Sequence, residues 1–135
     1  MSLTVLVLVV GFGIAAVVAA VHWSGGTTTA TLAGDDQARA RFAEDFPDEA
    51  PSRIWLTENR ETAFLDLGGG RVGIVQSFGD RFLTRIARRE DLAAAGRDDP
   101  VTVELCFRDF TWRGGRFRFA SADDAAALSS ALGLE

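Results

Sequence analysis

The chain opens with an unbroken apolar run. Residues 3–23 read LTVLVLVVGFGIAAVVAAVHW, and no side chain before Asp35 carries a formal charge when His22 is neutral. As a helix rising about 1.5 Å per residue, this run would be about 31 Å long, close to the hydrocarbon thickness of a bilayer. Only a helix satisfies its own backbone in lipid, so residues 1–23 are predicted to form a transmembrane helix with His22 and Trp23 at the interface.

A cleaved signal peptide is the alternative interpretation of this run. A signal peptide needs a basic first region and a shorter apolar core. Here Met1 and Ser2 precede the apolar run and neither is basic. The pattern favours a retained anchor, and the alternative is a periplasmic or secreted domain released after cleavage.

The pattern becomes mixed after the apolar run. Residues 24–34 read SGGTTTATLAG, a composition typical of a short flexible tether. Ala38, Phe42 and Phe46 then recur at four-residue intervals, which predicts a short amphipathic helix from Asp35, a capping residue, to Phe46, ended by Pro47. Residues 24–52 are therefore assigned to a linker that contains this helix.

Short segments of alternating polarity, separated by glycine-rich turns, follow from residue 53 and predict about six antiparallel strands. The segments are Arg53–Thr57, Glu61–Leu67, Val72–Ser77, Arg81–Ala87, Val101–Arg108 and Arg116–Ala120. Between the fourth and the fifth, Glu90–Ala95 is predicted as a short helix and residues 96–100 as a polar loop.

A second amphipathic helix ends the chain. Ser121 is a predicted N-cap with Asp124 as its acidic partner, and Ala125, Leu128 and Leu132 form the apolar stripe before Gly133. A helix that covers one face or end of a small antiparallel sheet makes the predicted fold class α+β, with the domain at residues 53–135.

Two resemblances agree with this element order. From Arg53 to Leu134, the order of strands and final helix resembles the pleckstrin-homology-like fold, a bent sheet plugged by a C-terminal helix. The stretches FLDLGGGRVGIVQSFGDRFLTRI and FRDFTWRGGRFRF, followed by an alanine-rich helix, resemble small single-span alphaproteobacterial membrane proteins of unknown function. That resemblance implies no activity, cofactor or functional residue.

Composition narrows the function classes. The 135 residues allow one ordinary domain, and 19 acidic against 14 basic side chains argue against nucleic-acid binding. One Cys and one His exclude an internal disulfide, a cysteine zinc site and any His pair. Every basic residue is arginine and alanine is frequent, which indicates a GC-rich bacterial genome.

The reactive candidates do not form a catalytic set. Cys106 lies in the middle of a predicted strand, far in the sequence from His22, so no Cys–His pair is expected. Residues 68–73 match G-x-G-x-x-G, but a predicted strand rather than a helix follows, so a hairpin is expected instead of a nucleotide site. We expect no catalytic residue, cofactor or metal.

Arginines cluster in the predicted strands. Arg81, Arg85, Arg116 and Arg118 are candidates for a basic patch that binds anionic lipid, and Trp112 is a candidate contact to a partner. The alternative is that these arginines pair with the many Asp and Glu side chains on a solvated face.

The apolar run also carries a candidate helix-pairing face. Gly11, Ala15 and Ala19 are spaced by four, and small residues so placed allow two helices to approach closely, as in a homodimer. Arg39 and Arg41 follow the run, which by the positive-inside rule places the domain in the cytoplasm. The resulting hypothesis is a single-pass protein of the bacterial inner membrane, a non-catalytic adaptor for lipid headgroups or a protein.

Overall fold

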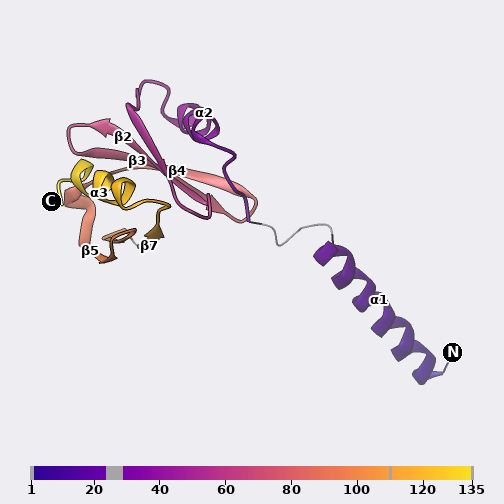
Figure 1. The fold of residues 1–135 in the computed structure, drawn as a ribbon. Helices are drawn as coiled ribbons and strands as arrows, with labels where there is room; N and C mark the ends of the chain where they lie inside the picture. The colour runs from indigo at the N-terminus through magenta and orange to yellow at the C-terminus, as the bar shows by residue number, and fades with distance from the viewer. Residues whose placement is uncertain (1, 24–28, 110, 135) are drawn as a thin grey trace.

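A computed structural model describes residues 2–23, 29–109 and 111–134. Helix α1 spans Leu3–Trp23 and extends away from the rest of the chain (Figure 1). Its large apolar side chains are 45–76% exposed, and it is long and apolar enough to cross a membrane, a property that a signal sequence shares. Residues 24–28 of the predicted tether, and the side chains of His22 and Trp23, lie outside the described part.

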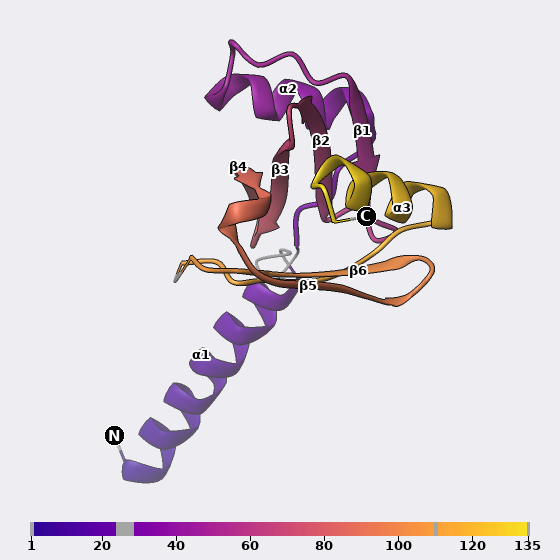
Figure 2. The same cartoon turned by 90° about the vertical axis from the view of Figure 1, so that its left-hand side faces the viewer.

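The remaining chain is an α+β domain, as the sequence predicted, and its strands form two antiparallel sheets rather than one. The first sheet has the order β1-β2-β3-β4, and its strands are Arg53–Leu56, Thr62–Gly68, Arg71–Phe78 and Arg81–Arg88. The second has the order β5-β6-β7, with strands Leu92–Asp99, Thr102–Phe107 and Gly114–Arg118. Its strands cross those of the first sheet (Figure 2), and a bridge between Thr57 and Phe119 joins the two at one corner.

The predicted helix Glu90–Ala95 and the loop after it are wrong. The chain instead makes one 3₁₀ turn at Arg89–Asp91 (η1) and then enters β5. Ala94, Ala95 and Gly96 pair with Cys106, Leu105 and Glu104 of β6. Alanine favours a helix when local propensity decides, but an available β6 edge offers this segment a complete ladder of backbone hydrogen bonds. The described domain therefore has seven strands where about six were predicted.

The main core lies between the two sheets. Trp55, Phe64 and Ile74 of the first sheet pack against a second group of buried side chains, and the Phe64 and Phe117 rings meet edge to face at 5.0 Å. That second group is Val103, Leu105, Phe107, Phe117 and Phe119.

Helix α3, Ala122–Ala131, closes one end of this core. Ser121 Oγ accepts a hydrogen bond from the Asp124 amide, as predicted, and Ala125, Leu128 and Leu132 are buried. Two antiparallel sheets followed by a C-terminal helix are loosely compatible with a pleckstrin-homology-like arrangement.

Helix α2, Asp35–Asp45, packs on the outer face of the first sheet. Phe42 is 1% exposed and lies over Gly73, where a Cβ atom would come within 2.6 Å of the Phe42 ring. The N-cap is Gly34 and not Asp35. The part of the predicted linker from Leu32 to Phe46 thus belongs to the packed domain, because its apolar side chains complete a second core cluster with Ala63, Leu65 and Val75.

Candidate functional site

The chain enters the domain at the end of the first sheet where two hairpin turns lie. The Ala30 amide donates to the Gly79 carbonyl at 2.7 Å, in the β3–β4 turn. The Leu32 amide donates to the Arg60 carbonyl at 2.7 Å, in the β1–β2 turn, and Leu32 is buried. Arg60 Nη1 donates back to the Ala33 carbonyl at 2.8 Å. We call this end, formed by residues 30–33, 58–61 and 79–80, the tether end.

Helix α3 covers the opposite end of the domain. Arg53, the first residue of β1, lies 4.0 Å from Asp124 in the first turn of α3, whereas the tether end follows the last residue of β1. Figure 1 shows α3 and the C-terminus on the side of the domain away from α1. The tether end is therefore the end that α3 leaves uncovered.

Two large apolar side chains are exposed beside the β3–β4 turn. Phe78, the last residue of β3, is 70% exposed, and Leu83 of β4 is 53% exposed. Phe78 pairs with Arg81, and Leu83 pairs with Gln76. Opposed residues of an antiparallel pair project to the same face, and so do residues two apart on one strand. Phe78, Arg81 and Leu83 therefore share one surface, which we call the hairpin patch.

A small cavity adjoins the hairpin patch. It measures about 130 Å³, and Phe78, Leu83 and Trp112 are among its lining residues, with Ile74 and Arg85. The Trp112 ring stacks on Phe107 at 5.0 Å between centroids. Trp112 is thus half-buried and forms the wall of this cavity.

Arg85 and Arg81 differ in their contacts, although both lie on this face of β4. The Arg85 guanidinium lies 4.5 Å above the Trp112 ring, and its Nη1 is 2.9 Å from Asp109 Oδ2. Asp109 also accepts hydrogen bonds from the Thr111 amide and hydroxyl, and these bonds, followed by the contact with Arg85, lower its pKa. Arg81 makes no side-chain hydrogen bond or ion pair with any residue that the structure describes.

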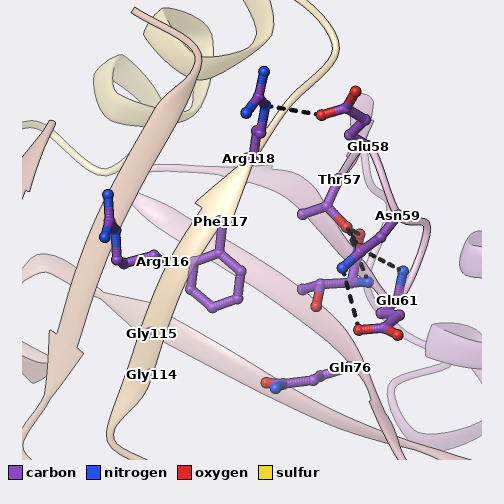
Figure 3. A pocket seen from close by; sticks show the side chains of 11 residues that line it. Thr57, Glu58, Asn59, Glu61, Gln76, Gly114, Gly115, Arg116, Phe117 and Arg118 are labelled. Carbon is purple, nitrogen blue, oxygen red and sulfur yellow. Dashed lines mark hydrogen bonds and ion pairs between the residues drawn. The ribbon is translucent and has the colours of Figure 1, made fainter. Parts of the chain in front are cut away.

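A polar groove of about 410 Å³ separates the β1–β2 turn from β7 (Figure 3). Arg118 reaches across it to Glu58, with Nε 2.9 Å from the carboxylate. The Asn59 side-chain oxygen accepts hydrogen bonds from the Thr57 hydroxyl and the Glu61 amide. These polar groups of the groove thus pair with one another.

The four candidate arginines occupy two sheets. Arg81 and Arg85 lie on β4, whereas Arg116 and Arg118 lie on β7. Arg116 pairs with Asp98 and Arg118 with Glu58, so both β7 arginines have acidic partners. On β7 the arrangement is the ion-paired, solvated face given as the alternative above. Of the four arginines, Arg81 belongs to the hairpin patch and Arg85 adjoins it.

The remaining sequence candidates are spread over the molecule. Cys106 is exposed on β6, and no three His, Cys, Asp or Glu residues in the described ranges come together as a metal site. Gly68, Gly69 and Gly70 have positive φ values and form the β2–β3 hairpin. Gly11, Ala15 and Ala19 lie along exposed α1, where pairing stays a prediction.

Sequence reasoning missed Phe78 and Leu83. The predicted strand ended at Ser77, which left Phe78 in the turn, and Leu83 read as an ordinary strand residue. The available signal was the two-residue alternation of a strand. Gln76 and Phe78 lie on the same face of β3 as buried Ile74, but they extend past the end of the core. Comparison of the chain with protein-family models, curated proteins and solved structures finds no match.

Proposed function

We propose that this protein is a membrane-anchored, non-catalytic module of the bacterial inner membrane. In this proposal α1 is retained as a single-pass anchor. The cytoplasmic α+β domain binds lipid headgroups or a protein at the membrane surface. The observation that carries the proposal is that α1 is apolar on every side and nothing in the described domain covers it.

The domain completes its core without α1. Both buried clusters draw their side chains from Leu32 onward, and none of the Leu3–Val21 segment is buried. Transfer of a Val, Leu or Ile side chain from water to an apolar surrounding is favourable by roughly 1.5–3 kcal/mol of free energy. A helix with this many exposed side chains of that kind therefore needs an apolar surrounding, and a bilayer supplies one.

The surface beside the tether end supports a binding role over catalysis. Arg118 and Arg85 are engaged by Glu58 and Asp109, in pairs that arrange the surface. The pKa of Asp109 is lowered, so this carboxylate stays ionised as an acceptor. An uncovered apolar surface beside the anchor is suited to contact with lipid or with a partner.

The test is a topology and retention measurement on the full chain. Alkaline phosphatase, or a fluorescent protein that matures only in the cytoplasm, is fused after Glu135, and membranes are washed with carbonate. We expect fluorescence, retention after the wash and an intact N-terminus by mass spectrometry. Phosphatase activity with a shortened, released product would contradict the proposal and establish the cleaved-leader alternative.

Substitutions in α1 sharpen this test. Val9→Arg with Val10→Arg puts two charges at the helix centre, at roughly 2.5–3.5 kcal/mol each for insertion, and should abolish retention. Ala40→Arg, on the exposed face of α2, is the matched control and should leave retention unchanged.

A further inference from the structure

We infer that the hairpin patch is a membrane-docking surface that binds the bilayer in which α1 is anchored. Phe78 and Leu83 enter the interfacial layer, and the Arg81 guanidinium contacts lipid phosphates. The inference rests on the proposed function, because it requires α1 to be in the membrane. It assigns to the uncovered end of the domain a partner of defined chemistry, an apolar interface with phosphate groups at its rim.

The covalent connection holds the patch close to the bilayer. Seven residue steps separate Trp23, the end of α1, from Ala30, and a chain cannot exceed about 3.6 Å per residue. The Ala30 amide is bonded to the Gly79 carbonyl, in the turn that carries the patch. Ala30 therefore lies within about 25 Å of the end of the anchor in any tether conformation, and the patch begins at the turn to which Ala30 is bonded. A domain joined through its α3 end would hold the same residues on its far side.

The composition of the patch fits a membrane interface. Among the described residues outside α1, Phe78 and Leu83 are the large apolar side chains that remain mostly exposed. They lie on neighbouring strands, on one face, at the outermost end of a hairpin. Such a projection can enter the headgroup layer while both strands keep their hydrogen bonds. Aromatic residues are enriched at this depth because their rings suit the boundary between apolar chains and water.

Arg81 occupies the position where a cation is needed. It lies directly opposite Phe78 in the register, so its aliphatic stem can follow the phenyl ring while its guanidinium reaches phosphate. Arg85 is held by Asp109 and Trp112 and supports the base of the patch. Trp112 and Arg85 thus brace the surface, and Phe78, Leu83 and Arg81 make the contact.

The charge of this end indicates that the apolar side chains contribute most of the free energy of docking. The chain has a formal net charge of −5, and Asp80, Glu58 and Glu61 lie at the same end as Arg81. These carboxylates offset the attraction of Arg60 and Arg81 to an anionic surface, so docking should depend only weakly on anionic lipid. A short tether provides an effective concentration in the millimolar range, so a weak interfacial affinity is sufficient.

The experiment measures the depth of the hairpin in the membrane with the full chain in liposomes. Cys106→Ser removes the single native cysteine. Asp80→Cys then carries an environment-sensitive fluorophore at the turn, and a separate Glu90→Cys variant carries it at the opposite end of β4. Lipids with nitroxide groups near the headgroup quench fluorophores at that depth. We expect quenching at position 80, no quenching at position 90, and little change when anionic lipid is replaced by zwitterionic lipid.

Variants then assign the contact. Phe78→Ser and Leu83→Ser should each lower the ratio of docked to undocked protein by about tenfold, because each removes one buried apolar side chain from the interface. Arg81→Gln should lower it by a smaller factor, because the variant loses a guanidinium contact that zwitterionic and anionic phosphates both offer. Arg116→Gln, on β7 away from the patch, is the matched control and should leave the ratio unchanged. Both apolar side chains are exposed, so circular dichroism should confirm an unchanged fold.

Four outcomes are distinguishable. Quenching at position 80 that Phe78→Ser weakens supports docking. An unquenched position 80 in a chain that resists carbonate extraction overturns docking and leaves the anchor intact. Shielding of position 80 from a water-soluble quencher without lipid quenching shows that protein, such as a second copy, covers the patch, and overturns the lipid assignment. A chain that is not retained by the membrane removes the proposed function and, with it, the docking surface.

Discussion

The two ends of strand β3 differ in a way that core packing does not explain. Residues 72–75 at its beginning are buried, Gln76 and Ser77 are half-buried, and Phe78 at its end is exposed. Exposure thus rises along the strand while the last side chain is among the most apolar. Val72, near the beginning of β3, shares a core cluster with α3, whereas the end of β3 leads into the turn where the chain arrives from α1.

The turns at these two ends show that an exposed aromatic is not required to form a hairpin. Gly69 and Gly70 both have positive φ in the β2–β3 turn, and residues 68–70 bring no side chain there beyond hydrogen. Gly79 has a positive φ in the β3–β4 turn, the first central position, where a type II′ turn favours glycine. That turn would close equally well with a polar residue in place of Phe78. The beginning of β3 thus contributes to the core, and its exposed end is the one to which we assign the proposed docking contact.

The largest expected effect on stability distinguishes Phe42 from Phe78. Phe42→Ala should lower the free energy of unfolding by about 3–5 kcal/mol, because Phe42 is fully buried between α2 and β3. Phe78→Ala should change it by less than about 0.5 kcal/mol, because its ring is already in water. Urea unfolding followed by circular dichroism measures both. Equal losses would show that Phe78 belongs to the core.

Two leucines test the same difference in stability between the end of the domain that α3 covers and the hairpin patch. Leu128→Ala in α3 should lower the free energy of unfolding by about 2–4 kcal/mol, because its side chain fills the covered end of the core. Leu83→Ala at the hairpin patch should have an effect below about 1 kcal/mol. Thermal unfolding at fixed lipid or detergent concentration checks both variants. A large loss for Leu83→Ala would contradict the assignment of that end to contact.

Glycine substitution gives a smaller and more local effect. Gly73→Ala should lower the free energy of unfolding by about 1–3 kcal/mol, because the new Cβ atom would overlap the Phe42 ring. Gly96→Ala in β5 is the matched control, with open space around the added methyl group and an ordinary φ, and should be neutral or slightly stabilising. Chemical denaturation of the pair provides the measurement. If Gly73→Ala proved neutral, α2 would not be seated on β3 as described.

The smallest effect is electrostatic and distinguishes two carboxylates. Glu49 receives two hydrogen bonds from Arg71, at 2.8 and 3.0 Å, which lower its pKa. Thr111 contributes more than Arg85 to the lowered pKa of Asp109. Arg71→Gln should therefore return the pKa of Glu49 toward its ordinary range, whereas Arg85→Gln should leave the pKa of Asp109 low. Carboxylate NMR titration checks both values.

The Glu49–Arg71 pair also predicts how the stability of the domain depends on pH. A carboxylate whose pKa is lower in the folded than in the unfolded chain contributes stability above its unfolded pKa, and this contribution is lost as pH falls through the folded pKa. The urea midpoint should therefore fall as pH decreases below about 4.5. Glu49→Gln should make that fall shallower. An equally steep fall in the variant would show that the Glu49–Arg71 pair does not contribute.

Much of the fold follows from local patterns. The apolar period and the Ser121 cap define α3, and Val103, Leu105 and Phe107 alternate on the inner face of β6 as predicted. Segment 92–99 is the exception, because its alanines carry no period and its conformation depends on pairing with β6. Gly73 is a second exception. A glycine is needed at this position because Phe42, about thirty residues earlier in the chain, packs over it and leaves no room for a Cβ atom.

The candidate site was predictable in parts. Arg81, Arg85 and Trp112 were identified by residue type. The structure brings Arg85 and Trp112 to one small cavity and places Arg81 opposite Phe78 in the hairpin beside it. Arg116 and Arg118 were grouped with them by charge, but β7 places both beside acidic partners that no local spacing reveals. Phe78 and Leu83 were overlooked because an apolar residue in a strand is normally a core residue, and only solvent exposure distinguishes them.

Local sequence patterns specify the long apolar helix, the α+β class and most of the strands. Each depends on residues within one turn of a helix or one strand, where periodicity and capping express the local free energy. Which end of the domain α3 covers, and which exposed side chains lie where the chain arrives from α1, depend on the tertiary structure. Those properties depend on hydrogen bonds such as Ala30 to Gly79, which join segments about fifty residues apart and leave no periodic signal in the chain.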